Sequence, residues 1–119
     1  MKFMAMVSSD ETVPPPPPAL YAAIMQLGAE ASKAGVLVEQ GGLMRSASGM
    51  RVRVSKGKIV VTDGPFAEAK EVIGGYAVYR VSSREEVLEW TRRFMQIHID
   101  NWPGWEGVSE VRQIYEQGG

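Results

Sequence analysis

The fold is organised around the stretch TDGPFAEAKE, residues 62–71, which the glycine pair Gly74-Gly75 closes. A β-branched run precedes Asp63, so we expect Asp63 at the end of a strand. Pro65 favours extended backbone at Gly64 and suits the first position of a helical turn. The stretch therefore predicts a strand, a tight corner, a short helical turn and, after the glycine pair, another strand.

The Asp63 carboxylate has two interpretations at this corner. In the first it is a structural staple that accepts the backbone N–H groups of Gly64 and Phe66, as in an Asx turn. In the second it lines a pocket as a general base or ligand acceptor, with Gly64, Pro65 and Phe66 beside it. Both uses of a carboxylate fit a corner, and the residues alone do not separate them.

Composition bounds the class of protein. The chain has 119 residues, which predicts a single domain over residues 1–119. Hydrophobic residues make up 45% and charged residues 23%, as in soluble globular proteins. The 13 basic and 14 acidic residues include no basic block, so we expect no nucleic-acid partner.

Several site classes are disfavoured by the residue types. Without cysteine and with one histidine, a disulfide, a thiolate nucleophile and a structural zinc site are not expected. No cofactor fingerprint is found, so we expect no cofactor. The apolar run after Lys2 is too short for a signal peptide or a membrane span, which predicts a cytoplasmic protein without a membrane partner.

Hydrophobic periodicity and residue propensity predict an alternating order of elements. In chain order they are a strand over 2–7, a helix over 19–34, a strand over 36–38, a hairpin over 50–62, a strand over 76–81, a helix over 84–98 and a strand over 109–116. Five consecutive prolines, 14–18, join the first strand to the first helix. They fit a stiff polyproline II connector, or a short recognition motif for a proline-binding domain.

Without the inserted hairpin the order is βαββαβ, which is the ferredoxin-like, split-βαβ α+β fold. Two helices can cover only one face of such a sheet, and strand alternation predicts what each face carries. The set suited to the helices is Phe3, Ala5, Val7, Ala77, Tyr79 and Val81. The opposite set is mixed: Lys2, Met4, Met6, Tyr76, Val78 and Arg80. A mixed face predicts a partner sheet across a partly wet cavity, and hence a homodimer.

The stretch from Val61 to Tyr76 resembles the signature of the DGPF-motif branch of the YCII-related proteins. This resemblance implies a dimeric ferredoxin-like α+β barrel with a cleft near the interface. Ala69 replaces the more usual threonine. The wider family has a suspected catalytic His–Asp pair with an early histidine, but 19–34 contains none, so the pair is not carried over although Asp63 matches the motif.

His98, the only histidine, lies on the apolar side of its helix. It either completes the core at the helix end or replaces the missing histidine as general acid or base opposite Asp63. Trp102 and Trp105 flank Pro103-Gly104, where they form either a packed aromatic corner or a wall for a flat ligand.

Two arginines complete the candidate site. Arg80 is expected on the mixed face, and Arg112 can join it. Together they bind a ligand carboxylate or phosphate, or they form ion pairs with Glu110 or Glu39.

Three functions remain open from sequence. The first is an enzyme that acts on a small organic molecule by acid–base chemistry, with Asp63 and His98 as the candidate catalytic residues. The second is a non-catalytic binding or regulatory module, because the resemblance also implies association with sigma-factor systems. The third is a dimer in which the motif is wholly structural. Binding of a small molecule is favoured, with its identity open.

Overall fold

The computed structural model describes residues 1–11, 13–66 and 71–117. Six strands, two α-helices and one 3₁₀ turn make up this part of the chain. In order they are β1 (Lys2–Ser9), α1 (Pro18–Lys33), β2 (Leu37–Gly42), η1 (Ser46–Ser48), β3 (Met50–Ser55), β4 (Lys58–Asp63), β5 (Val72–Arg80), α2 (Arg84–Asn101) and β6 (Gly107–Gln113).

Four strands form an antiparallel sheet in the order β2-β5-β1-β6, and β3 and β4 form a separate hairpin. The register pairs Ala5 with Ala77 across β1 and β5, and Ala5 with Val111 across β1 and β6. The predicted ferredoxin-like α+β fold is confirmed. The two strands that the hairpin separates in sequence, β2 and β5, lie side by side in the sheet.

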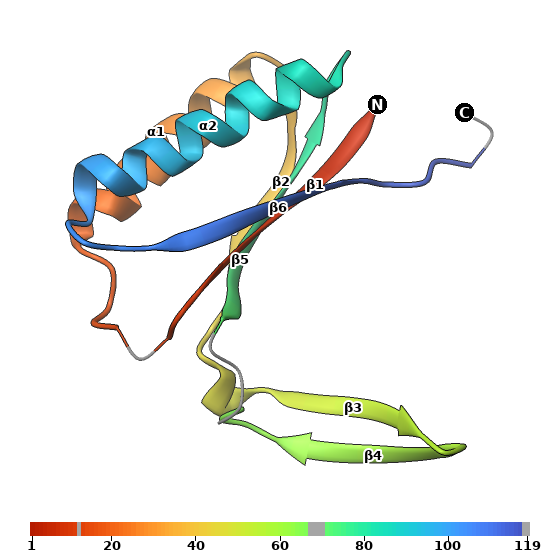
Figure 1. Cartoon of the computed structure of the whole chain (residues 1–119). Coiled ribbons are helices and arrows are strands. Elements are labelled where there is room, and N and C mark those ends of the chain that lie inside the picture. The colour runs from red at the N-terminus through yellow and green to blue at the C-terminus, as the bar shows by residue number, and fades with distance from the viewer. Residues whose placement is uncertain (12, 67–70, 118–119) are drawn as a thin grey trace.

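Both helices cover one face of the sheet, and the other face is left open (Figure 1). Five of the six residues assigned to the helix side belong to the core, together with side chains from both helices, whereas the sixth, Val7, is half-buried. This core comprises Phe3, Ala5, Ala31, Val36, Ala77, Tyr79, Val81 and Val87. On the opposite side Met4, Met6 and Val78 are only half-buried. The alternation therefore separates the two faces as predicted.

Local signals account for the helix ends. Pro18 occupies the first turn of α1, and Gly35 follows its end with a φ of 77°, a value that favours glycine. At the start of α2 the Ser83 hydroxyl accepts the backbone N–H of Glu86 at 3.1 Å, and the Glu86 carboxylate accepts the N–H of Ser82 at 3.0 Å. The first bond satisfies an N–H group that the first turn of the helix leaves unpaired, and the second fixes the residue before the N-cap.

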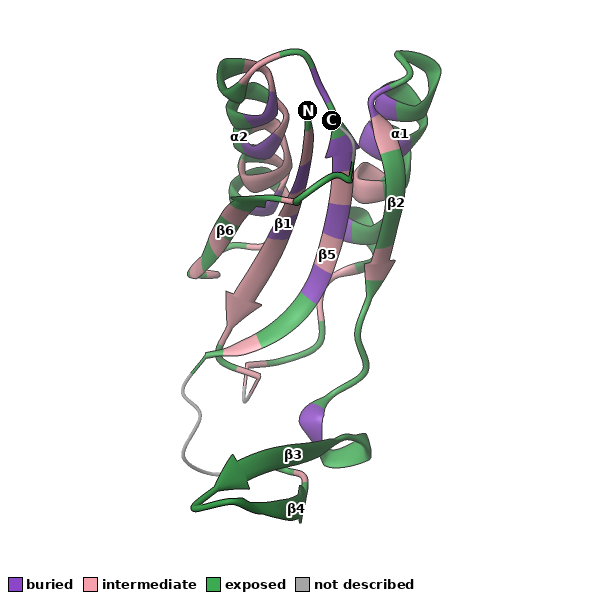
Figure 2. Ribbon diagram, turned by 90° about the vertical axis from the view of Figure 1, so that its right-hand side faces the viewer, coloured by how far each residue is buried: buried purple, intermediate pink, exposed green. Residues whose placement is uncertain are grey.

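The hairpin β3–β4 projects from the sheet as an arm, and every residue of its two strands is exposed (Figure 2). Its turn contains Lys56 and Gly57, both with positive φ, at 50° and 75°. The radius of gyration is 16.0 Å, whereas a compact chain of this length has about 13.5 Å. The extended arm explains the difference, because the sheet and helices alone form two packed layers.

Element boundaries differ modestly from the predictions. The first helix begins at Pro18, so the last proline of the run belongs to the helix and the connector is shorter than 14–18. The strand predicted over 76–81 already begins at Val72 and includes the glycine pair. The helical turn predicted after Pro65 falls mostly on residues 67–70, outside the described residues. No helix in the described part of the chain is long and apolar enough to cross a membrane.

Candidate functional site

The Asp63–Phe66 corner joins the arm to the rest of the molecule through close backbone packing. A Cβ at Gly64 would lie 1.7 Å from the carbonyl oxygen of Ser46, so the position accepts only glycine without a shift of the backbone. The N–H of Gly64 donates to the Gly49 carbonyl at 2.9 Å. The corner is thus pressed against η1, and its glycine has a steric explanation.

A cluster that we call the Glu11 clasp, made of Glu11, Arg45 and Ser46, anchors this corner to the loop after β1. The Glu11 carboxylate accepts the backbone N–H of Ser46 at 2.9 Å and also the Ser46 hydroxyl. The Arg45 guanidinium donates to the carbonyls of Glu11 and Val13 at 2.6 and 3.1 Å. Ser46 is 5% exposed, so it is the buried centre of the clasp.

Electrostatics follow this geometry. The hydroxyl and then the backbone N–H of Ser46, with a smaller contribution from the charge of Arg45, hold the pKa of the Glu11 carboxyl below its usual value. The Ser46 hydroxyl in turn accepts the N–H of Phe66 at 3.4 Å, and the Arg51 guanidinium lies 4.0 Å from the centroid of the Phe66 ring. Ser46 and Arg51, which are 20 and 15 positions from Phe66 in the sequence, therefore stabilise the corner.

The proposed staple at Asp63 is wrong in its donors. The N–H groups of Gly64 and Phe66 donate to the Gly49 carbonyl and the Ser46 hydroxyl, not to the Asp63 carboxylate. Asp63 is the last residue of β4 and is exposed. The corner is stapled, but Glu11 and Ser46 act as the staple.

A groove of about 710 Å³ begins beside the Glu11 clasp, since Glu11 and Arg45 are part of its wall, and extends to the end of α2. Its size falls in the range of sites that bind small organic molecules, about 300–1,000 Å³. The walls come from six segments: Ser9–Glu11 with Val13–Pro16, the first half of α1, Gln40–Arg45, Val72–Tyr76, the last turns of α2, and the corner after α2. We call it the aromatic groove.

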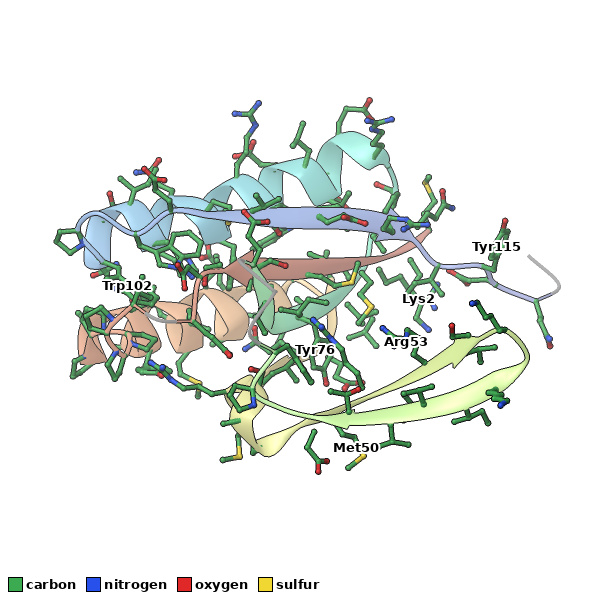
Figure 3. All side chains as sticks on the ribbon, turned by 60° about the horizontal axis from the view of Figure 1, so that its bottom comes forward. Lys2, Met50, Arg53, Tyr76, Trp102 and Tyr115 are labelled. Carbon is green, nitrogen blue, oxygen red and sulfur yellow. The ribbon has the colours of Figure 1, made fainter. Side chains whose placement is uncertain are left out.

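The aromatic groove takes its name from four rings at one wall. The centroids of Phe94 and His98 are 4.7 Å apart, and those of His98 and Trp105 are 4.5 Å apart. Trp102 stacks on Trp105 with 5.8 Å between centroids and an interplanar angle of 22°. Figure 3 shows Trp102 where the end of α2 meets the start of α1. Such rings supply flat apolar area for a ligand.

His98 is buried beside these rings, 4% exposed, and its tautomer is fixed. Its Nδ1 lies 2.8 Å from the Phe94 carbonyl oxygen, which can only accept, so Nδ1 carries the hydrogen and Nε2 the lone pair. Burial lowers the pKa of His98, although the bond to Phe94 acts in the opposite direction. At neutral pH the ring is therefore a neutral imidazole that can accept a hydrogen bond or a proton at Nε2.

Trp105 lines the aromatic groove, and its indole nitrogen is a buried polar atom. Its indole N–H has no hydrogen-bond partner among the residues that the structure describes. A buried donor without a partner costs about 1–3 kcal/mol, so such groups are rare in folded proteins. The ring can lie there because residue 107 is glycine, where a Cβ would approach the indole to 2.3 Å.

The two arginines lie on the open face of the sheet. Arg80 pairs with Glu116 and Arg112 with Glu110, each at 3.4 Å, and the four side chains are substantially exposed. The ion-pair interpretation thus has a structural basis for both, with Glu116 as an acceptor that the sequence did not suggest. Beside them the Tyr76 hydroxyl donates to Glu39, and this bond raises the pKa of Tyr76.

The predicted site residues therefore divide into three groups. His98, Trp102 and Trp105 meet in the aromatic groove, next to the glycine pair. Asp63, Gly64, Pro65 and Phe66 lie at the arm and are not in its walls. Arg80 and Arg112 belong to the open face. The catalytic roles of Asp63 and His98 stay predictions, and the structure does not place the two residues in one groove.

Sequence reasoning missed three residues that matter. Glu11 and Ser46 are 35 positions apart, so no local pattern links them. Gly107 had a usable signal, because a glycine two positions after a tryptophan leaves room for the indole to fold back on the strand. Within the described residues, no group of three or more histidine, aspartate and glutamate side chains is placed to hold a metal ion.

The chain also matches the model of a known protein family. A family model described as the YCII-related domain matches residues 1–116, so the chain belongs to the YCII-related family. A search of curated proteins gives no match.

Proposed function

We propose that the protein binds a small, flat organic molecule in the aromatic groove. The observation that carries this proposal is the unpartnered, buried N–H of Trp105, in a groove that also contains the neutral imidazole of His98. A ligand with a hydrogen-bond acceptor satisfies the indole once the ring turns its buried N–H toward the groove, and a donor group on the same ligand matches Nε2 of His98. Stacking on Trp102 and contact with Phe94 supply the apolar part of the affinity.

Binding is a better-supported function than catalysis. His98 is a suitable proton acceptor, but the walls of the groove do not include Asp63, so the expected His–Asp partnership has no support within a single chain. Cofactor-independent acid–base chemistry at His98 stays part of the proposal as a second step. A non-catalytic regulatory module, including one associated with sigma-factor systems, is the alternative when binding occurs without turnover.

A thermal-shift and fluorescence screen tests the proposal. The probes are benzoate, salicylate, 4-hydroxybenzoate and nicotinamide, which are flat and carry acceptors. A ligand at 100 times its dissociation constant stabilises the protein by about 2.7 kcal/mol. Two of the three tryptophans line the groove, so binding should also change the intrinsic fluorescence.

Matched variants locate the site. Trp105→Phe removes the N–H donor, and we expect up to about tenfold weaker binding from the loss of one hydrogen bond. Trp90→Phe is the control, because Trp90 lies on α2 outside the groove and packs on the core. A probe that binds wild type and both variants equally would place the site elsewhere, and the absence of any hit would favour the regulatory alternative.

We also propose a homodimer in which the open faces of two sheets meet. Met4, Met6 and Val78 are half-buried on a face without helices, and charged residues surround them. A mixed surface of this kind is typical of an interface. Light scattering of Met6→Glu against wild type tests it: the variant should have the mass of a monomer, and a wild-type protein that is already monomeric would reject the dimer.

A further inference from the structure

The arm has two chemically different faces. Strand alternation and the register of β3 on β4 separate them, with Val52 opposite Val61 and Val54 opposite Ile59 on one side. The residues of this outer face are Met50, Val52, Val54, Ile59, Val61 and Asp63. The residues of the inner face are Arg51, Arg53, Ser55, Lys58, Val60 and Thr62. Figure 3 shows Arg53 pointing toward the sheet and Met50 pointing away from it.

The outer face of the arm is apolar and exposed to solvent. Val52 is 63% exposed, Val54 75%, Ile59 72% and Val61 60%, whereas Val60 on the inner face is 37% exposed. Among the described residues, the two strands of the arm pack extensively only on each other. An isolated two-stranded hairpin is marginally stable in water. The arm therefore requires a partner surface, and the more apolar face is the one to bury.

We propose that the outer face of the arm is a self-association surface on which the arm of a second copy of the chain packs. The inference is independent of the aromatic groove and goes beyond the facing-sheet dimer, which uses another surface.

Charge supports a second copy as the occupant. All three cations of the two strands, Arg51, Arg53 and Lys58, lie on the inner face, so two outer faces meet without repulsion between like cations. In an antiparallel stack, Asp63 at the base of one arm lies near the turn of the other, which carries Lys56. A surface that is complementary to itself is what a two-fold contact needs.

The geometry fits a small sandwich. Two hairpins stacked through their apolar faces lie about 10 Å apart, as two packed sheets do. Each arm offers about 20 Å of strand length and two strands of width, roughly 200 Å². Stable interfaces bury about 800 Å² per partner. The contact should therefore be weak and concentration-dependent, and should add to any facing-sheet dimer rather than replace it.

Sedimentation velocity from low to high micromolar concentration tests the proposal with adjacent valines. Wild type should gain mass as concentration rises. Val61→Glu, on the outer face, should shift this rise to at least tenfold higher concentration, and Val60→Glu, the matched inner-face control, should not. A Val61→Glu profile identical to wild type would overturn the proposal. A loss of association in Met6→Glu with unchanged Val61→Glu behaviour would assign the association to the facing sheets alone.

A second measurement does not depend on a charged substitution. The chain has no cysteine, so one engineered cysteine reports on one position. Val61→Cys, in the middle pair of the outer face, should form cross-linked dimers with a bismaleimide whose spacer is about 10 Å, the separation of packed sheets. Val60→Cys, on the inner face, should form few cross-linked dimers. Equal cross-linking at both positions, or none at Val61→Cys, would reject the arm-to-arm contact.

Discussion

The Asp63–Phe66 corner and the Trp102–Trp105 corner both contain a proline and a glycine between distinctive side chains, yet they do different things. The first is held in place: its glycine packs on a carbonyl oxygen, and its amides donate to Ser46 in η1 and to Gly49 directly after η1. The second lines a groove with stacked rings, and its buried indole N–H has no hydrogen-bond partner among the described residues.

This contrast indicates that an unusual sequence motif can reflect a steric restriction on the backbone rather than a catalytic or binding role. Gly64 is explained by a contact that excludes any side chain. The ligand-ready features are instead a neutral histidine and an unpartnered donor, which are defined by burial and hydrogen bonding. Local sequence is informative about the first kind of constraint and less so about the second.

The largest effect should come from Gly64→Ala. The added Cβ would require the corner and η1 to separate, and we expect a loss of about 1–3 kcal/mol in the free energy of unfolding. Gly74→Ala is the matched control, because a Cβ there has no neighbour within 4 Å. Urea denaturation of both variants measures the difference. Equal stabilities would show that the corner yields easily, and the contrast between the two corners would weaken.

The next effect concerns pH at the aromatic groove. The unfolded His98 titrates near 6.5, and burial lowers its pKa in the folded protein. Between the two values the unfolded chain binds more protons, so stability is full above 6.5 and falls as the pH drops through this window. His98→Gln should remove that fall, although it loses ring contacts worth about 1–3 kcal/mol.

Thermal melts at a series of pH values check this prediction. His98 is the only histidine, so the titration near neutral pH has a single side-chain source. A variant whose stability still declines to the same extent below pH 6.5 would contradict the assignment of a buried neutral imidazole.

A smaller, more acidic effect is expected at the Glu11 clasp. Bonds from Ser46 lower the pKa of Glu11 from its usual 4.5, so the carboxylate contributes stability above that value and loses it as the pH falls through the lower, folded value. Glu11→Gln should flatten the acid limb of the stability profile and leave the His98 window unchanged. Glu106→Gln, in the exposed turn before β6, is the control. Two variants with the same acid limb would exclude the clasp as its source.

The smallest effect is that of the cation–π contact between Arg51 and Phe66. Phe66→Leu should cost about 0.5–1 kcal/mol, the usual size at an exposed site. A double-mutant cycle with Arg51→Ala separates this coupling from other losses. A coupling energy of zero would contradict this prediction and would mean that the corner is stabilised by its backbone hydrogen bonds and by the packing of Gly64.

The fold could be predicted from the sequence because the patterns that indicate its helices and strands are local. Alternation of apolar residues in β1 and β5 predicted which face meets the helices. The arm was predicted as a hairpin over 50–62, where the structure has β3 and β4. Each of these signals spans a few residues of one element.

The candidate site could be predicted only in part. His98, Trp102 and Trp105 were identified by type, but their meeting in one groove depends on where α2 ends relative to α1 and β2. One of the two interpretations of Asp63 placed it in a pocket opposite His98, whereas it lies at the end of β4 on the arm and outside the groove walls. The acceptors that hold its corner come from Glu11 and Ser46, which chain connectivity alone does not bring together.

Periodicity and turn residues act within one element, so the ferredoxin-like order of elements, the two faces of the sheet and the hairpin of the arm could be predicted from the sequence. Contacts between distant elements could not. Whether a polar group has a hydrogen-bond partner depends on which atoms the fold brings near it. Ser46 packs against Gly64, and the Phe94 carbonyl fixes the His98 tautomer. The indole N–H of Trp105 has no partner among the described residues.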